Sequence, residues 1–540
     1  MDCISTRVPY QQTGYFSKIV LDYLDQSPAL RAFYSHDVNL QGIQAAIEQR
    51  KAFNTDRKLL QTELQRQYSA LETSEAVTNN IRLLANDNTF TICTAHQPNI
   101  FTGNLYFIYK ILHAIKLADT LKLQLPQYHF VPVFYMGCED ADLDELGHIH
   151  LNGEKLVWDT KQTGAVGRMN TKGLEKIIHQ VEGQIGIFPH GKELITLLKQ
   201  CYLESPDIQT ATFKLVNALF ADYGLVVLIP DNPNFKRAMR PVFEEDLLEQ
   251  IPSSVVQQSV QAMDKAGFKV QAHPREINLF YLKDNVRERI IQNGSGHKVN
   301  GPKDSSGSGK VKFSPDELQQ ALQDEPEVFS PNVILRGLFQ ETILPDVAFI
   351  GGGGELAYWL ELKGLFDHYH VPFPVLVLRN SFLVVESNWK QKMDKLQLSD
   401  ADIFLPEQEL MNVLVKKESG NQLTIQEEIE EAKRLYEKLK AISGKIDVTL
   451  AQHVSALETS ALNKLKELEK KLLRAERRKF SDYQRQVNTI KQALFPNNSL
   501  QERVENFLPY YARWGRQFFD IIYRCSGPMQ DGFVVINVRD

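Results

Sequence analysis

The stretch PDVAFIGGGGELAYWLELKGLFDHYHVPFPVLVLR, residues 345–379, decides the fold class of this chain. It holds an apolar strand pattern, four consecutive glycines, a run with apolar residues at helical spacing, and a second apolar strand pattern. A strand, a helix and a strand in so short a stretch form a βαβ unit, which favours a parallel sheet. TFTICTA (89–95), a helical pattern over 103–122 and HFVPVFYM (129–136) predict a second unit, and YGLVVLIPD (223–231) predicts a further strand. We therefore predict an α/β fold, a Rossmann-like doubly wound parallel sheet with helical insertions.

The sequence pattern changes along the chain, and the changes suggest how the chain is divided. We expect a helical lead-in over 1–85, the Rossmann-like core over 86–415 with insertions near 160–220 and 285–330, a C-terminal α-helical coiled-coil arm over 420–495, and a segment over 496–540 that returns to the core. Residues 293–312 are rich in Gly, Ser and Lys, which predicts a solvated loop or hairpin tip.

The predicted arm rests on the spacing of its apolar residues. Between Leu435 and Leu494 these residues recur at intervals of three and four, which is typical of a coiled coil. Gly444 is expected to divide the run into a shorter helix and a long helix over 446–494. Because one helix cannot bury its own apolar stripe, the long helix needs a hairpin partner, a second subunit or both.

Composition excludes several classes of protein. The chain is 43% hydrophobic and 24% charged, with a net charge of −6, so no basic field points to a nucleic-acid partner. The sequence lacks an apolar run long enough to cross a membrane and any spacing of ligands typical of zinc. Its five cysteines are scattered, which favours a reducing compartment over a disulfide framework. We expect a cytoplasmic, soluble protein with no metal-ligand set.

The loop TAHQPNIFTGN, residues 94–104, is the first candidate site, because it follows a strand and precedes a helix. In doubly wound sheets, ligands bind at the carboxyl ends of the strands. Backbone N–H groups at the helix start could hold an anion, and a side chain in the loop could contact a phosphate or a leaving group. The alternative is a polar turn that caps the helix. The predicted binding residues here are His96, Gln97, Asn99, Thr102, Gly103 and Asn104.

The loop MGCEDADLDEL, residues 136–146, is the second candidate, because acidic residues crowd behind the second strand. Such groups can bind magnesium, an ammonium group or sugar hydroxyls. The alternative is a solvated loop whose carboxylates complement a helix dipole. The acidic residues are Glu139, Asp140, Asp142, Asp144 and Glu145.

The glycine run is the third candidate, and its motif argues against a phosphate loop. The pattern GxxxxGK[ST] is absent, and the dinucleotide fingerprint GxGxxG fails at its later part. Glu355 at the helix start would repel a phosphate but would suit an amine or sugar hydroxyls, while Arg336 and Arg379 could bind a carboxylate or phosphate. We interpret the run as a tight turn that brings backbone close to a substrate. The other residues predicted to bind here are Gly351, Gly352, Gly353, Gly354, Tyr358 and Ser381.

Several of these segments occur together in a known family. FTGNLYFIYKILHAIKLA, PVFYMGCEDADLDEL, the block over 330–379 and LFPNNSLQERVENFLPYYARWG resemble the bacillithiol biosynthesis cysteine-adding enzymes, the BshC family. The resemblance implies a ligase that joins cysteine through its carboxylate to the amine of glucosaminyl-malate, with ATP or ADP as nucleotide and magnesium as a possible ion. It also implies a homodimer formed through the coiled coil. Family members commonly carry Gln-Gln at His96-Gln97, and often a proline within the glycine run, where this chain has Gly353.

This resemblance suggests roles for the candidate residues. The expected catalytic residues are Glu355, Glu139, Asp140 and His96. Of these, Glu355 or Asp140 would bind the ammonium group and accept its proton, and Arg336 would stabilise developing charge. The nucleotide phosphates would lie at the helix start after Thr102. Two other classes stay open: a nucleotidyltransferase-like enzyme that acts on another small molecule, and a non-catalytic coiled-coil scaffold.

Overall fold

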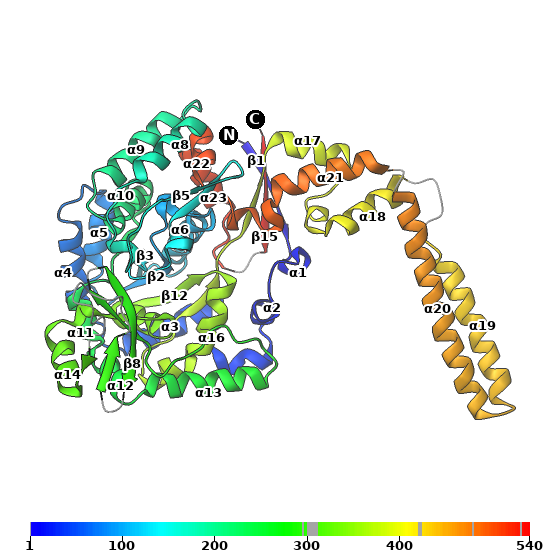
Figure 1. Ribbon diagram of the computed structural model, residues 1–540, viewed down its shortest axis with the longest axis horizontal. Helices are drawn as coiled ribbons and strands as arrows, with labels where there is room; N and C mark the ends of the chain where they lie inside the picture. Colours follow the sequence, from blue (N-terminus) through cyan, green and yellow to red (C-terminus); the bar gives the residue numbers. More distant parts are fainter. Residues whose placement is uncertain are drawn as a thin grey trace.

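A computed structural model describes residues 2–283, 285–293, 296–299, 312–418, 424–477, 480–529 and 532–539 of the chain. Its centre is a five-stranded parallel sheet in the order β13-β12-β2-β3-β6 (Figure 1). The strands of this sheet are β2 (Thr89–His96), β3 (His129–Met136), β6 (Val226–Leu228), β12 (Asp346–Gly351) and β13 (Val375–Leu378). The chain runs outward in one direction from β2 and in the other from β12, so the order of the strands reverses between these two. This order confirms the predicted doubly wound class.

Helices cover both faces of the central sheet. Helices α3 (Leu40–Lys51) and α6 (Tyr106–Gln124) share an apolar cluster with Ala348 and Ile350 of β12. Phe349 points to the opposite face, where it stacks on Trp359 of α16 (Gly353–His368) with 4.4 Å between ring centroids. Because side chains of β12 point alternately toward helices on the two faces, the strand is apolar from Val347 to Ile350.

The other helices of the body surround this core. They are α1 (Tyr10–Thr13), α2 (Lys18–Leu24), α4 (Arg57–Tyr68), α5 (Glu75–Leu83), α7 (Leu143–Leu146), α8 (Leu174–Ile185), α9 (Gly191–Leu203), α10 (Ile208–Phe220), α11 (Pro233–Ala238), α12 (Arg240–Leu248), α13 (Ile251–Lys265), α14 (Pro315–Asp324), α15 (Val333–Ile343), α17 (Ser387–Lys395), α22 (Leu508–Trp514) and α23 (Arg516–Cys525). Helices α8, α9 and α10 lie within the predicted insertion near 160–220.

A second sheet joins the two ends of the chain, which Figure 1 shows close together. Strand β1 (Asp2–Val8) pairs antiparallel with β15 (Phe533–Arg539), and β14 (Phe382–Val385) pairs parallel with β15. The expected helical lead-in over 1–85 is therefore incomplete, because it begins with a strand. The partner of this strand lies at the far end of the sequence, so local periodicity does not reveal it.

The insertion near 285–330 contributes an antiparallel sheet in the order β10-β9-β8-β7-β11. Its strands are β7 (Leu279–Lys283), β8 (Val286–Asn293), β9 (Gly296–Val299), β10 (Lys312–Phe313) and β11 (Phe329–Pro331). A small hairpin, β4 (His148–Leu151) with β5 (Glu154–Val157), follows the acidic loop. Most of the Gly/Ser/Lys-rich stretch, predicted as a loop or hairpin tip, lies outside the described residues.

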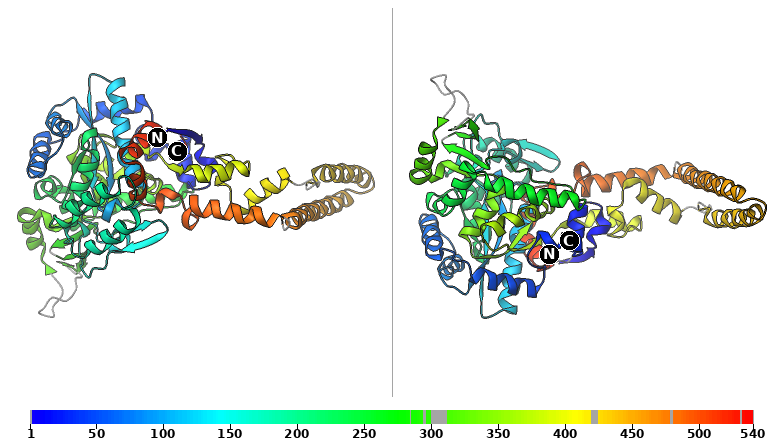
Figure 2. Two further views of the ribbon diagram at one scale, coloured as in Figure 1. Left: turned by 90° about the horizontal axis from the view of Figure 1, so that it is seen from above. Right: turned by 90° about the horizontal axis from the view of Figure 1, so that it is seen from below.

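The arm projects from the body as a helical hairpin (Figures 1 and 2). Its helices are α18 (Glu407–Glu418), α19 (Gln426–Gly444), α20 (Val448–Arg477) and α21 (Ser481–Leu494). Gly444 ends α19 as predicted, but the single long helix over 446–494 is wrong, because α20 ends at Arg477 and α21 begins at Ser481. The two helices have different surroundings: Val487 of α21 is fully buried, whereas Leu457 of α20 is 47% exposed.

A buried charged cluster anchors the end of β12 opposite the glycine run. Arg50 donates to the carboxylate of Glu341 at 2.6 Å and to its backbone oxygen at 2.7 Å. Asp346 accepts from the hydroxyl of Thr91 at 2.8 Å and also bonds to Glu341. Burial and the neighbouring Glu341 raise the pKa of Asp346 well above its ordinary value. One guanidinium therefore faces two carboxyl groups, and Asp346 keeps its proton.

We expect Asp346→Asn to preserve the free energy of unfolding, because an amide donates to Glu341 as the protonated carboxyl does. The pKa of Asp346 is higher in the folded state than in the unfolded state, where it is about 3.9. Protonation of Asp346 therefore stabilises the folded protein fully below about pH 3.9, and this stabilisation is lost as the pH rises toward the folded-state pKa. Urea unfolding between about pH 5 and about pH 9 should show wild type losing stability relative to Asp346→Asn. Arg50→Met is the comparison and should cost about 3–5 kcal/mol. Equal destabilisation by Asp346→Asn and Arg50→Met at neutral pH would contradict the inference that Asp346 is protonated in the folded protein.

Candidate active site

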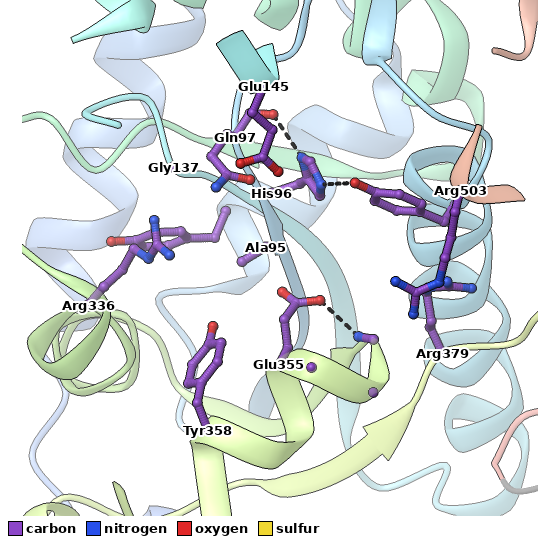
Figure 3. A pocket seen from close by; sticks show the side chains of 15 residues that line it. Ala95, His96, Gln97, Gly137, Glu145, Arg336, Glu355, Tyr358, Arg379 and Arg503 are labelled. Carbon is purple, nitrogen blue, oxygen red and sulfur yellow. Dashed lines mark hydrogen bonds between the residues drawn. The ribbon is translucent and has the colours of Figure 1, made fainter. Parts of the chain in front are cut away.

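A cavity of about 320 Å³ lies at the carboxyl ends of β2, β3, β12 and β13, where the strand order reverses (Figure 3). Ligands of doubly wound folds bind at this switch point. The cavity is lined by Ala95, His96, Gln97, Tyr106, Tyr135, Gly137, Glu145, Arg336, Gly352, Gly353, Gly354, Glu355, Tyr358, Arg379 and Arg503. The structure thus brings together residues from all three candidate stretches of the sequence, the loops over 94–104 and 136–146 and the glycine run.

Glu355 lies at the floor of the cavity and is held by a buried lysine. Nζ of Lys110 donates to the two carboxylate oxygens of Glu355 at 2.9 and 2.7 Å and to the backbone oxygen of Ala95 at 2.5 Å. Glu355 also accepts from the N–H of Gly352 at 2.8 Å, as the third residue of α16. Burial acts to raise the pKa of Glu355, but Lys110 and Gly352 outweigh it, so the pKa is lowered. Glu355 is therefore an ionised group of low basicity.

His96 is held as a neutral imidazole. Nδ1 lies 3.1 Å from the backbone oxygen of Gln97, and Nε2 lies 3.2 Å from the hydroxyl of Tyr106. Because a carbonyl oxygen only accepts, Nδ1 carries the proton and Nε2 accepts from Tyr106. Burial and the neighbouring Lys110 lower the pKa of His96 to about 4. An imidazole with so low a pKa is a weak base, which argues against the predicted acid–base role.

Arg336 and Asp140 form a pair at one side of the cavity. Nη1 of Arg336 donates to Oδ2 of Asp140 at 2.7 Å, and Arg287 of β8 lies 3.5 Å from Oδ1. Burial acts to raise the pKa of Asp140, but the two guanidinium groups outweigh it and lower the pKa. Asp140 therefore positions Arg336 rather than accepting a proton.

Two other acidic-loop residues that the sequence singled out lie outside the cavity. Glu139 is 7% exposed and forms an ion pair with Lys236, whose side chain is fully buried. Asp142 accepts from the N–H of Glu145 at 3.2 Å and caps the short helix α7. The expected catalytic role of Glu139 is not supported by this placement, because its charge is already neutralised behind the cavity wall.

Arg379 lines the cavity but is bound to the C-terminal segment. Nη2 of Arg379 donates to Glu502 at 2.7 Å, and Nη1 donates to the hydroxyl of Ser381 at 3.1 Å. Glu502 is fully buried, so the pair is shielded from solvent. Ser381 itself is buried away from the cavity, and it holds Arg379 in place.

The turn over Thr102, Gly103 and Asn104 does not present the expected set of free N–H groups to an anion. The N–H of Thr102 donates to the backbone oxygen of Asn99 at 3.1 Å, and that of Gly103 donates to Ile100 at 3.0 Å. The backbone oxygens of Phe101 and Gly103 accept from the side chain of Asn506, and the side chain of Asn104 donates to the backbone oxygen of Arg503 at 2.9 Å. The C-terminal segment therefore covers this turn. Gly103 has φ +64°, and a Cβ there would lie 2.8 Å from Cβ of Asn99, so the glycine serves the turn rather than a ligand.

The glycine run does face the cavity. Gly352, Gly353 and Gly354 line it at the start of α16, and none of the four glycines has a positive φ. A Cβ on Gly351 would lie 2.9 Å from the Phe349 ring, whereas a Cβ on Gly354 would meet nothing within 4 Å. Gly351 is thus required by packing, and Gly354 leaves room for a ligand.

Two charged groups at this site, Lys110 and Arg503, were not among the residues predicted from the sequence, and Glu145 was named only as one member of the acidic loop. Lys110 lies in an apolar helical run, and this position was the available sequence signal that its side chain is buried and needs a partner. Arg503 comes from a segment far from the core strands, and no local pattern marks it. Glu145 lies in the acidic loop and lines the cavity, where burial and the neighbouring Asp142 raise its pKa. Glu145 is therefore the most basic carboxylate of the cavity wall.

Within the part of the chain that the structure describes, no three His, Cys, Asp or Glu residues are grouped so as to hold a metal ion. None of the described helices is both long and apolar enough to span a bilayer.

Comparisons with known proteins agree with this architecture. The model for the bacillithiol biosynthesis BshC N-terminal Rossmann-like domain matches residues 1–380, and the model for the BshC C-terminal coiled-coil domain matches residues 382–538. Proteins named "Putative cysteine ligase BshC" are similar over nearly the full length. That of Flavobacterium johnsoniae is 39% identical, with 99% of each chain covered, and that of Cytophaga hutchinsonii is 35% identical, with 97% of each covered.

Solved structures align only weakly. The arginyl-tRNA synthetase of Thermus thermophilus covers 98% of this chain and 97% of its own at 10% identity, but its TM-score of 0.18 carries no argument. The two matching domain models and the full-length relatives show that this chain is an enzyme of the BshC ligase family of bacillithiol biosynthesis.

Proposed function

We propose that this chain joins the carboxylate of L-cysteine to the amine of glucosaminyl-malate, which forms the amide bond of bacillithiol. Family membership supports the reaction class, and the charge pattern of the cavity supports the substrate. Glucosaminyl-malate carries two carboxylates and one amine, so it needs cationic groups on one part of its site and an anionic group on another.

The unpaired carboxylate of Glu145 is the observation that carries this proposal. Glu355 and Asp140 each hold a cation already, at 2.7 Å in both cases. Glu145 has no ion-pair partner among the described residues, and its pKa is raised by burial and by Asp142. A group of this kind binds an ammonium ion and takes up its proton, which leaves the neutral amine that attacks an activated carboxyl group.

The opposite part of the cavity fits an anion. Arg336 keeps a side chain that is 25% exposed while Asp140 fixes its position. The N–H groups of Gly353 and Gly354 begin α16 beside it, where the helix dipole favours negative charge. Because Lys110 neutralises Glu355, that carboxylate does not repel an anion there, and the repulsion expected from the sequence is weakened.

Activation of cysteine is expected to come from ATP, because amide formation from a free carboxylate in water is uphill. The nucleotide would supply an acyl phosphate or an adenylate. Arg336 and the start of α16 are the groups on this chain that would hold its phosphate oxygens, in place of the turn at Thr102. Magnesium would be held mainly by those phosphates, because the described residues offer no carboxylate cluster for it.

Product analysis tests the proposal against the two other classes. Purified protein with cysteine, glucosaminyl-malate and ATP should yield bacillithiol and a nucleotide product by mass spectrometry. Transfer of a nucleotidyl group to another molecule would favour the nucleotidyltransferase class. If a deletion strain keeps its bacillithiol, neither the ligase activity nor the proposed substrate can stand.

We expect Lys110→Met and Glu355→Gln each to lower kcat, because each breaks a pair that shapes the cavity floor. Each single variant should also lose about 3–5 kcal/mol of stability, because it leaves a buried charge without its partner. The double variant should recover most of this stability, as measured by urea unfolding, but should not recover activity. Wild-type kcat in the double variant would show that the reaction does not use the carboxylate of Glu355.

A bulkier residue at Gly354 should block the cavity without unfolding the protein. Gly354→Leu places a side chain in open space, so we expect kcat/KM to fall about tenfold or more, equivalent to about 1.4 kcal/mol of binding. Gly183→Leu is the matched control, because Gly183 lies in α8 and a Cβ added to it would also meet nothing within 4 Å. Both variants should keep the thermal midpoint. Unchanged kcat/KM in Gly354→Leu would place the substrate elsewhere.

We further propose that the arm forms a homodimer. Apolar side chains on the hairpin stay exposed after α19 and α20 have packed together: Leu435 55%, Leu439 40%, Ile442 61%, Leu457 47% and Leu468 47%. Exposed apolar patches of this extent mark interaction surfaces, and the C-terminal domain matches the BshC coiled-coil model.

Leu457→Glu/Leu468→Glu should therefore give a monomer by light scattering with an unchanged body. Ser460→Glu/Asn463→Glu adds the same charge at exposed polar positions of α20 and should remain dimeric. A dimer in the leucine variant would place the contact outside this stripe.

A further inference from the structure

The segment after the arm, residues 500–506, reaches the cavity through the side chain of Arg503. Gln501 is fixed to β14, because its side chain accepts from the N–H of Val384 at 2.9 Å and donates to the oxygen of Val384 at 3.2 Å. Glu502 accepts from Arg379 at 2.7 Å and from the N–H of Phe382 at 3.1 Å. These bonds fix the backbone immediately before Arg503.

The residues after Arg503 are fixed as firmly. The backbone oxygen of Glu505 accepts from the N–H of Leu105 at 2.7 Å, and Asn506 donates to Phe101 at 2.9 Å. The backbone oxygen of Arg503 itself accepts from Asn104 at 2.9 Å. The exposed side chain of Arg503 therefore extends from an anchored backbone into the cavity, where Figure 3 shows it beside Arg379.

Arg503 differs from the other two arginines of the cavity. Arg336 has Asp140 at 2.7 Å and Arg379 has Glu502 at 2.7 Å. Across the described ranges, no carboxylate lies within ion-pair distance of the Arg503 guanidinium. Its charged neighbours are the cation Arg379, which already pairs with Glu502, and the more weakly acting carboxylates of Glu502 and Glu355. An incoming anion would therefore form the close ion pair that this guanidinium lacks among the described residues.

We propose that Arg503 is an anion-binding residue that the segment following the arm supplies to the active site. Its ligand is a carboxylate or phosphate group of a substrate, which its planar guanidinium can hold through two parallel bonds. This deepens the proposed function, on which it rests for the identity of the substrate. The C-terminal domain then contributes directly to substrate binding, besides any role in assembly.

Binding of simple anions tests the inference apart from catalysis. The probes are L-malate, which has the carboxylates of glucosaminyl-malate, and inorganic phosphate, each titrated calorimetrically into the full-length chain. Arg503→Met should weaken binding of at least one probe about tenfold or more, and Arg503→Lys should weaken it less, because charge remains but the paired geometry is lost. Arg524→Met is the matched control, since it removes one exposed positive charge outside the cavity and should leave binding unchanged.

Each outcome has a defined meaning. Loss of malate binding alone names a carboxylate as the ligand, and loss of phosphate binding alone names a phosphate. Binding of both probes by Arg503→Met within about twofold of wild type overturns the inference, as does no measurable binding of either probe by wild type.

The ligation assay separates this inference from the proposed function. If Arg503 governs anion binding but no bacillithiol forms, the function fails and the inference stands. If bacillithiol forms and Arg503→Met has wild-type KM and kcat, the inference fails and the function stands.

Discussion

The buried ion pair between Lys110 and Glu355 is the interaction on which the geometry of the candidate active site depends. Lys110 belongs to the helix that follows β2, and Glu355 belongs to the helix that follows β12. The strand order reverses between these two strands, so the pair joins the two halves of the sheet at the point where a ligand would enter. The Lys110 side chain is only 2% exposed, and its charge is tolerable there because a carboxylate and a backbone oxygen receive its bonds.

A second constraint is the turn that carries the chain from β2 into α6. Phe101, Thr102 and Gly103 all have positive φ, a conformation that residues with side chains rarely adopt. Such a turn persists only when its surroundings fix it. Here Tyr202 accepts from the N–H of Phe101 at 2.8 Å, and Asn506 donates to both Phe101 and Gly103. The first βα loop therefore depends on a segment some four hundred residues later, and the arm lies between them in the sequence.

The sequence predicted what local pattern and sheet topology determine. The two βαβ patterns located four of the core strands, and the apolar run over 223–231 located the fifth. The rule that ligands meet at the carboxyl ends of parallel strands brought His96, Gln97 and Glu355 together. The sequence pattern could not show which charged side chains already form ion pairs in the folded protein. Glu139 looked as catalytic as Glu355 because its partner, Lys236 of α11, lies about a hundred residues away in the sequence.

The same limit explains the remaining errors. The turn at Thr102 has the composition of an anion site, but the N–H groups of Thr102 and Gly103 already donate within the turn, and that of Leu105 donates to the distant Glu505. The apolar stripe over 446–494 continues past Phe480, whose backbone is not α-helical, because α20 and α21 each need an apolar face although they pack against different neighbours. Conversely, the apolar residues around Lys110 gave no indication in the sequence of a functional group. Because those residues are buried, Lys110 is buried with them and needs the ion pair with Glu355.

Most charged residues that line the cavity already form ion pairs. Two of them have no ion-pair partner in the described structure, the carboxylate of Glu145 and the guanidinium of Arg503. They come from the acidic loop after β3 and from the segment that follows the arm. A ligand that is only an anion would satisfy Arg503 and face Glu145 unfavourably, and a simple amine would do the reverse. A molecule that carries both an amine and carboxylates satisfies both groups at once, which is why we propose an amino-sugar acid and not a bare nucleotide as the primary occupant of this cavity.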